Sequence, residues 1–131
     1  MNAQNYDKLM QNQIEKLGGR KKLLLHCCCA PCSSACLERL KDYFDITVFF
    51  YNPNIDDEEY SKRKNELLRL IEITGWAKAA DCDHDTAEFY DRVKGLEKEK
   101  EGGKRCEACF KLRLEKTAKF AAAGGWDYFT T

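Results

Sequence analysis

The sequence predicts an α/β fold, in which a parallel sheet is packed between helices. One observation predicts this fold class, and a second predicts that the chain forms a single unit. Short segments of strand character alternate with segments of helical periodicity, as in parallel strands joined by crossover helices. The 131 residues contain no internal repeat and only two prolines, so one compact unit is expected. We expect a helical arm at residues 1–21 and one α/β domain at residues 22–131.

The first elements are an arm helix, a strand and a second helix. Residues 5–17 carry apolar side chains at helical spacing, which predicts an amphipathic helix. Residues 22–27 form an apolar run typical of a buried strand. Pro31 suits the first turn of the helix that follows. The apolar stripe of that helix is predicted to contain Cys36, Leu37, Leu40 and Phe44.

The middle of the chain repeats the pattern. Residues 46–51, "ITVFFY", are β-branched and aromatic, which favours a strand. The next segment, "NPNIDDEE", is a loop whose acidic side chains suit the start of a helix running to about Thr74. Residues 76–83 give a weak signal for a third strand.

The last third supplies two helices and a strand. Asp85 followed by Glu88 resembles a capping box. A long helix is predicted over residues 106–123, and residues 126–131, "WDYFTT", predict the fourth strand. The apolar face expected for the long helix consists of Phe110, Leu114, Ala118 and Ala121.

Two motifs fall at the same edge of the predicted sheet. The cysteine-rich segment 27–32 directly follows the first strand, and "YNPN" (51–54) follows the second. Open parallel sheets bind their ligands beyond the carboxyl ends of the strands. We therefore expect the functional site at this edge.

Composition and charge narrow the class of protein. No apolar run approaches the ~20 residues of a membrane span, and the N-terminus has no apolar region typical of a secretory signal. We expect a cytoplasmic protein with no membrane partner, whose eight cysteines point to metal or redox chemistry rather than disulfides. The net charge of zero excludes a uniformly basic nucleic-acid binder but not a local basic face.

The cysteines form two separated groups. Four lie within residues 27–32, and Cys106 and Cys109 form a C-x2-C pair at the start of the long helix. Thiolates at a helix N-terminus are stabilised by the helix dipole. Together the two groups of cysteines predict a metal or cluster site. Because the groups are far apart in the sequence, only folding can bring them together.

Not every thiol fits this site. Cys27 is expected to pack in the core as the last residue of a strand, Cys36 falls on a predicted apolar stripe, and Cys82 stands alone. The best remaining ligand candidates are Cys28, Cys29, Cys106 and Cys109, with Cys32 one helical turn farther. Adjacent cysteines fit tetrahedral zinc poorly, and a larger iron–sulfur cluster accommodates them better.

Four ordered motifs resemble the cobalamin-independent epoxyqueuosine reductases of tRNA. They are "LLLHCCCAPCS", "FFYNPNI" with "EEYSKRK", "GGKRCEACFKLRLEKTA" and "WDYFTT". The likeness covers residues 22–131. It implies a Rossmann-like fold related to the ATP-pyrophosphatase and nucleotide hydrolase superfamily. Members usually continue beyond the last motif into a Ser-Pro-containing segment, so we expect this chain to lack their C-terminal segment.

The resemblance also implies an activity and its cofactors. Members reduce the epoxide of epoxyqueuosine at the tRNA wobble position to give queuosine, with an iron–sulfur cluster of the 4Fe-4S type and an additional mononuclear iron. The implied cluster ligands are Cys28, Cys29, Cys106 and Cys109. Cys32 is a candidate ligand of the second iron. The partners implied are a tRNA with a queuosine-type anticodon and an external one-electron donor of the ferredoxin or flavodoxin type.

Tyr51 and Asn52 are candidate catalytic residues together with Cys32. At the edge beside the thiols they can hydrogen-bond the substrate or donate a proton. An equally supported interpretation is a turn held by Asn and Pro. Both alternatives stay open at this point.

The long helix is also a candidate RNA-binding element. Between Lys104 and Lys119 there are six basic and two acidic side chains on a chain of zero net charge. The candidate RNA-binding residues are Lys104, Arg105, Arg113, Lys116 and Lys119. A solvated helix face is the alternative interpretation.

Two other functions compete with the reductase. An ATP-dependent tRNA-modifying enzyme of the pyrophosphatase type would share the fold, but it needs a glycine-rich phosphate loop where this chain has "CCCAPCSS". A zinc-stabilised binding module without catalysis would share the cysteines, and metal content separates it from a cluster protein.

Overall fold

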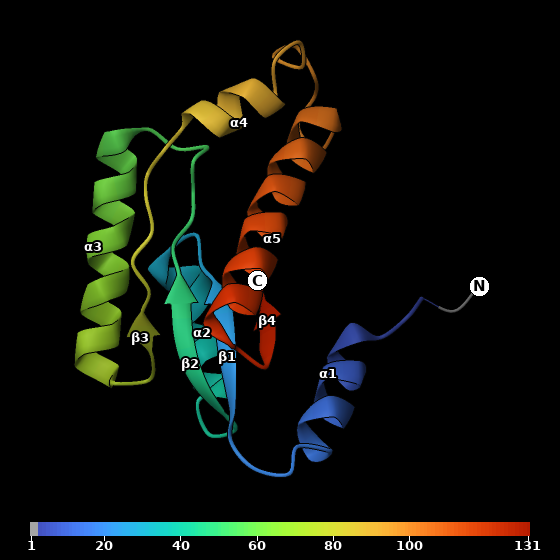
Figure 1. The fold of residues 1–131 in the computed structure, drawn as a ribbon, viewed down its shortest axis with the longest axis vertical. Helices are drawn as coiled ribbons and strands as arrows, with labels where there is room; N and C mark the ends of the chain where they lie inside the picture. The colour runs from blue at the N-terminus through green and yellow to red at the C-terminus, as the bar shows by residue number, and fades with distance from the viewer. Residues whose placement is uncertain (1–2) are drawn as a thin grey trace.

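The computed structural model describes residues 3–131 and contains five helices and four strands within them (Figure 1). Their order is α1 (Tyr6–Glu15), β1 (Lys21–His26), α2 (Ala30–Leu40), β2 (Phe44–Phe49), α3 (Asp57–Thr74), β3 (Lys78–Ala79), α4 (Ala87–Arg92), α5 (Lys104–Gly124) and β4 (Tyr128–Thr130). None of the helices described is long and apolar enough to cross a membrane.

The sheet confirms the predicted fold class. Its strand order is β3-β2-β1-β4, and every neighbouring pair is parallel. In the central pair, Leu24 lies opposite Thr47 and His26 opposite Phe49. β1 and β2 therefore end level with each other, and the residues that follow them share one edge of the sheet.

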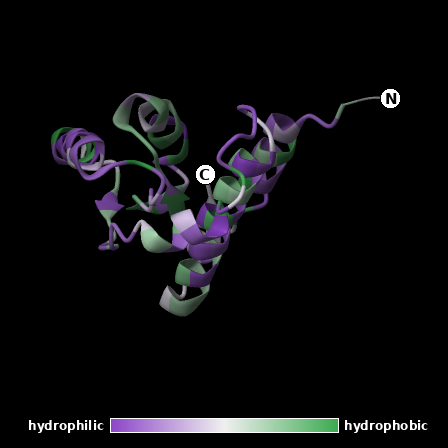
Figure 2. Ribbon diagram, turned by 90° about the horizontal axis from the view of Figure 1, so that it is seen from above, coloured by the Kyte–Doolittle hydropathy of each residue, from purple (hydrophilic) through white to green (hydrophobic). Residues whose placement is uncertain are grey.

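Helices cover both faces of the sheet. α2 and α3 pack on one face, where Leu37 and Leu67 join strand residues such as Leu25 in a buried cluster. Ile14 of α1 belongs to the same cluster. α4 and α5 pack on the other face, which carries Leu24. Figure 2 shows hydrophilic and hydrophobic residues side by side within the helices, as expected for helices with one buried side.

Local signals set the ends of α3. The Asp56 carboxylate accepts a hydrogen bond from the Glu59 N–H at 2.8 Å, which caps the first turn. Gly75 ends the helix at φ 65°, a left-handed conformation that glycine adopts without strain. The predicted end at Thr74 is confirmed.

The predicted apolar face of α5 was wrong in two of its four residues. Phe110 is 58% exposed and Leu114 is 40% exposed, whereas Leu112 and Thr117 are fully buried. Burial of Thr117 leaves no polar group unpaired, because its hydroxyl donates a hydrogen bond to the Arg113 carbonyl at 2.7 Å. The buried face therefore contains a polar residue, and a count of apolar residues alone misplaces it.

Substitutions on α5 test which face is buried. Leu112→Ala is expected to lower the free energy of unfolding by about 2–5 kcal/mol, because it leaves a cavity in the core. Leu114→Ala, on the exposed side, is expected to cost less than about 1 kcal/mol. Urea denaturation of the two variants measures the difference. A larger cost for Leu114→Ala would show that the helix is rotated from the orientation described.

Candidate metal centre

The cysteine-rich segment lies at the carboxyl edge of the sheet, between β1 and α2 (Figure 1). Cys29 is the N-cap of α2, with extended backbone angles of φ −165° and ψ 161°. Pro31 occupies the first helical turn, where its missing N–H costs nothing. Cys32 follows in the same turn, so helical geometry brings its side chain back toward Cys29.

Three thiols come together here. The Sγ atoms of Cys28, Cys29 and Cys32 all lie within 4.8 Å of one another, and those of Cys28 and Cys29 are 4.0 Å apart. Two thiolates on one tetrahedral zinc are about 3.8 Å apart, from a Zn–S bond of about 2.3 Å. Cys28 and Cys29 are partly buried, and Cys32 is exposed. The group therefore has the spacing, donor type and accessibility of a metal site.

Buried hydrogen bonds fix the segment that carries these thiols. The Cys27 N–H donates to the Phe49 carbonyl at 3.1 Å, and the Asn52 side-chain amide donates to the Cys27 carbonyl at 2.9 Å. On the helix side, the Ser33 hydroxyl donates to the Cys29 carbonyl at 2.7 Å. The backbone on either side of Cys28 is therefore anchored to both β2 and α2.

His26 adds a further connection at this edge. Its Nε2–H donates to the Tyr51 carbonyl at 2.7 Å, which leaves Nδ1 to accept from the Thr131 hydroxyl at 3.2 Å. Burial is the main cause that lowers the pKa of His26, so the ring is neutral at pH 7. His26 joins the segments after β2 and β4 to the end of β1.

The three thiols differ in how readily they ionise. Burial and the neighbouring Cys29 raise the pKa of Cys28. Burial also opposes ionisation of Cys29, but hydrogen bonds from the Cys32 thiol and backbone outweigh it and lower the pKa of Cys29. The same hydrogen bond and the charge on Cys29 raise the pKa of Cys32 to about 11. The metal-free group therefore holds its first negative charge on Cys29, and Cys32 keeps its proton.

Alkylation should reveal this order. In the reduced, metal-free protein at neutral pH, we expect iodoacetamide to modify Cys29 faster than Cys32, although Cys32 is the more exposed thiol. The reason is that the thiolate is the nucleophile, and the lower pKa gives Cys29 the larger thiolate fraction. Peptide mapping by mass spectrometry measures both rates. Faster modification of Cys32 would show that exposure, not ionisation, controls the reaction.

α5 closes the other side of this group. Phe110 and Arg113 line a cavity of about 160 Å³ together with Cys28 and Cys32. The Arg113 guanidinium stacks over Phe110 at 4.9 Å, and its buried Nε has no hydrogen-bond partner among the described residues. Its charge favours the thiolate form of Cys28. Arg113, which the sequence placed among the RNA-binding residues, thus lies beside the thiols.

Cys36 lines the same cavity, which corrects its expected place in the core. Its side chain is exposed, because α2 buries the face formed by Ser33, Leu37 and Leu40. Cys36 follows Cys32 by four residues and so lies on the same flank of the helix. That spacing is visible in the sequence and would have placed Cys36 near the site. Cys27 is buried in the core cluster, as expected.

Cys106 and Cys109 lie in the first two turns of α5. Cys109 is 8% exposed and belongs to the core cluster that also contains Leu24 and Phe89. Cys106 is partly buried, and its Sγ accepts a hydrogen bond from the Gly102 N–H at 3.3 Å. Neither thiol belongs to the group of Cys28, Cys29 and Cys32, whose Sγ atoms lie within 4.8 Å of one another. Their part in a larger cluster stays a prediction.

The two other candidate catalytic residues are both buried. Asn52 is 2% exposed and uses its amide to hold Cys27, which agrees with the structural interpretation of this turn. Tyr51 lines a separate cavity of about 380 Å³ with Cys82, Glu88 and Lys116 among others. Burial, followed by the charge of Glu88, raises the pKa of Tyr51 to about 12. Its phenol therefore keeps its proton at any physiological pH.

The basic side chains of α5 have different surroundings. Lys104 and Lys119 are exposed. Lys116 forms an ion pair with Glu88 at 2.8 Å, and Arg105 lies over the Phe89 ring at 5.8 Å. The expected basic surface is therefore partly neutralised, and among the candidate RNA-binding residues the exposed charges lie at Lys104 and Lys119.

Comparison with known proteins gives a consistent result. A family model described as "Epoxyqueuosine reductase QueH" matches residues 23–131. The chain is 44% identical over 121 residues to a Histophilus somni protein of that name, covering 91% of this chain and 49% of the relative. It is 42% identical to the Staphylococcus epidermidis protein (95% and 57% covered) and 42% identical to the Haemophilus influenzae protein (93% and 50%). The chain spans about half the length of these curated relatives.

Proposed function

Because this chain belongs to the epoxyqueuosine reductase QueH family, we propose that it takes part in reducing epoxyqueuosine to queuosine at the tRNA wobble position. The reaction removes the epoxide oxygen as water and leaves a carbon–carbon double bond, so it consumes two electrons and two protons. The observation that carries the proposal is the group of Cys28, Cys29 and Cys32 at the carboxyl edge of the sheet. Thiolates are the ligands used by redox-active iron–sulfur centres.

The donor set fits a metal. We propose that Cys32 holds a second iron and that four thiols hold the cluster, namely Cys28, Cys29, Cys106 and Cys109. When bound, such a centre supplies electrons one at a time and a Lewis acid for the departing oxygen. The close spacing of Cys28, Cys29 and Cys32 supports placing the second iron directly beside the cluster.

The chain's own groups would handle protons and orientation. Tyr51 keeps its proton, because burial raises its pKa to about 12, and in this proposal it is the candidate proton donor on the chain. Asn52 keeps the segment before Cys28 in place through its hydrogen bond to Cys27. Arg113 offers a fixed positive charge beside the thiols. We assign Asn52 and Arg113 positioning roles in this proposal.

The proposed partners are a tRNA with a queuosine-type anticodon and an external one-electron donor of the ferredoxin or flavodoxin type. α5 begins next to Cys106 and carries exposed Lys104 and Lys119, which suit phosphate contacts. Lys116 must leave Glu88 to contact a phosphate, so its contribution to RNA binding is expected to be smaller.

Charge reversal tests the RNA surface. Lys104→Glu with Lys119→Glu is expected to weaken binding to an anticodon stem-loop and to flatten the salt dependence of the affinity by about 0.9 in log–log slope per lost phosphate contact. Filter binding at several salt concentrations measures both. The matched control is Lys8→Glu with Lys16→Glu, which makes the same charge change near α1. Equal loss in both variants would indicate nonspecific attraction and contradict the α5 surface.

An activity assay tests the proposal itself. The reconstituted chain, a chemical reductant and tRNA containing epoxyqueuosine are incubated without oxygen, and nucleosides are then separated by liquid chromatography with mass detection. We expect queuosine to form and the Cys29→Ala variant to form none. The full-length Haemophilus influenzae relative is the positive control. If that protein forms queuosine and a cluster-loaded preparation of this chain does not, the proposal fails for this chain.

A further inference from the structure

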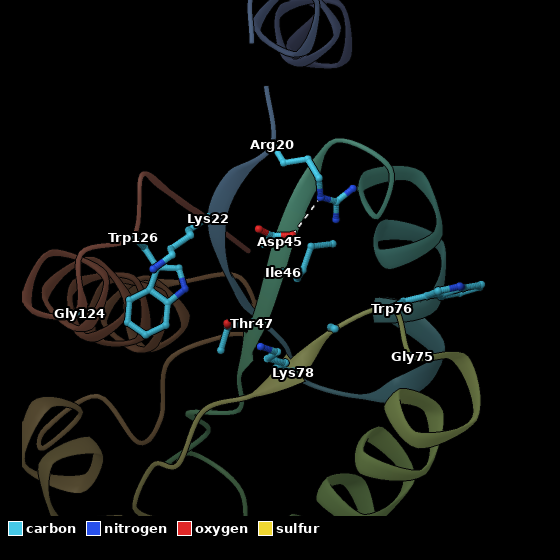
Figure 3. Close-up of a pocket in the computed structure, with 11 residues that line it drawn as sticks. Arg20, Lys22, Asp45, Ile46, Thr47, Gly75, Trp76, Lys78, Gly124 and Trp126 are labelled. Carbon is cyan, nitrogen blue, oxygen red and sulfur yellow. Dashed lines mark hydrogen bonds and ion pairs between the residues drawn. The ribbon is translucent and has the colours of Figure 1, made fainter. Parts of the chain in front are cut away.

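A larger cavity lies at the opposite end of the sheet from the cysteines. It has a volume of about 550 Å³ and is lined by residues at the starts of β1, β2 and β3 and after α5 (Figure 3). The side chains that matter for its chemistry are Arg20, Lys22, Asp45, Thr47, Lys78 and Trp126. The proposed reductase site uses none of them.

Strand register explains why this end is polar. Lys22 lies opposite Asp45, and Thr47 lies opposite Lys78, so these side chains project from the same face of the parallel sheet. Farther along that face, Leu24 and Phe49 are buried against α5. The face therefore changes from polar to apolar along the strands, and its polar end borders the cavity.

Two lysines carry the free positive charge of this cavity. Arg20 is neutralised by Asp45 at 3.0 Å and also donates to the carbonyls of Asp42 and Phe44, so it fastens a loop. Lys22 and Lys78 are exposed, and within residues 3–131 neither forms an ion pair. The cavity thus offers two ammonium groups to an anion.

Trp126 gives the cavity a rigid aromatic wall. A Cβ at Gly124 would lie 1.8 Å from the Trp126 ring, so the ring packs on the helix end only because residue 124 is glycine. Phe120 supports the ring at 5.4 Å between centroids. Figure 3 shows Lys22, Thr47 and Trp126 on the α5 side of β2, with Lys78 at β3; all four line the cavity.

We propose that this cavity binds a nucleotide. Its phosphate lies between the ammonium groups of Lys22 and Lys78 and accepts a hydrogen bond from the Thr47 hydroxyl, and its base stacks on Trp126. Ammonium and hydroxyl groups are phosphate ligands, and every base presents a π face to an aromatic ring. The nucleotide can be a free mononucleotide or one unit of an RNA strand. The inference does not depend on the reductase activity.

Tryptophan fluorescence offers a direct assay, because both tryptophans of the chain, Trp76 and Trp126, line this cavity. In the Trp76→Phe variant, Trp126 is the one remaining tryptophan, so the fluorescence signal comes from Trp126. Adenosine 5′-monophosphate and a single-stranded oligoadenylate are titrated separately. We expect saturable quenching, which stacking on the indole produces.

Matched variants distinguish nucleotide binding in this cavity from nonspecific electrostatic attraction to the protein surface. Lys22→Ala with Lys78→Ala is expected to weaken binding at least about fivefold, and Gly124→Ala, which displaces the ring, by a similar factor. The control is Lys21→Ala with Lys94→Ala, which removes the same charge outside the cavity and is expected to change affinity less than about twofold. Circular dichroism confirms that each variant is folded.

The outcomes decide between the two sources and test the site. Quenching by the mononucleotide supports a free-nucleotide site, and quenching by the oligonucleotide alone supports a contact to an RNA strand. Absence of saturable quenching with either probe overturns the proposal. So does quenching that Lys22→Ala with Lys78→Ala leaves unchanged.

Discussion

Cys29→Ala is expected to abolish iron binding by this chain. Cys29 lies at the centre of the site, because its sulfur accepts a hydrogen bond from Cys28 and one from Cys32 and carries the first negative charge of the group. Loss of an outer-shell partner alone lowers metal affinity roughly 10–100-fold. Loss of a ligand thiolate should therefore reduce iron content after reconstitution to background. Iron and sulfide are measured on the desalted protein.

Two other cysteines serve as controls for this variant. Cys27→Ala is expected to keep its iron but to lose about 1 kcal/mol of stability, because Cys27 is 2% exposed and packs in the core. Cys36→Ala removes an exposed thiol and should change stability little. Background iron in Cys27→Ala, or full iron in Cys29→Ala, would contradict the assignment of the site.

Cys106→Ala is expected to prevent assembly of the cluster while leaving the protein folded. The reason is that the proposal needs thiol ligands from α5 in addition to those beside β1. Cys32→Ala is expected to have the opposite pattern, keeping the cluster and losing only the second iron. Iron-to-sulfide ratios and visible absorbance distinguish the two variants.

The converse result would select a different ligand set. Cys28, Cys29 and Cys32 are the thiols that lie within mutual 4.8 Å among the described residues. If Cys106→Ala kept its full iron and sulfide and Cys32→Ala lost all of both, these three thiols would hold the cluster, and α5 would contribute none.

The fold could be predicted because its signals are local. Apolar runs at β1 and β2 and helical periodicity between them require only neighbouring residues, and both strands were placed within two residues of their observed ends. The weak third strand is only Lys78–Ala79, because β3 pairs with no more than Thr47 and Val48 of β2. A strand that short leaves almost no pattern in the sequence.

The site could be predicted only in part, because side-chain direction depends on packing. Cys28, Cys29 and Cys32 follow from one strand end and one helix start. The position of Arg113 beside them depends on the rotation of α5, whose buried face contains the polar residue Thr117 as well as Leu112. Cys36 was expected in the core because it falls on an apolar stripe with Leu37 and Leu40, but the buried face contains Ser33 instead.

The central claim is that the thiols beside β1 belong to an iron–sulfur redox centre. The most direct measurement is metal and sulfide analysis, with visible spectra, of the chain purified and reconstituted without oxygen. We predict a brown protein with iron and acid-labile sulfide in equal amounts from the cluster, an excess of iron from the second site, and bleaching on reduction. A colourless protein that holds zinc and no sulfide would contradict the claim and identify a structural zinc site.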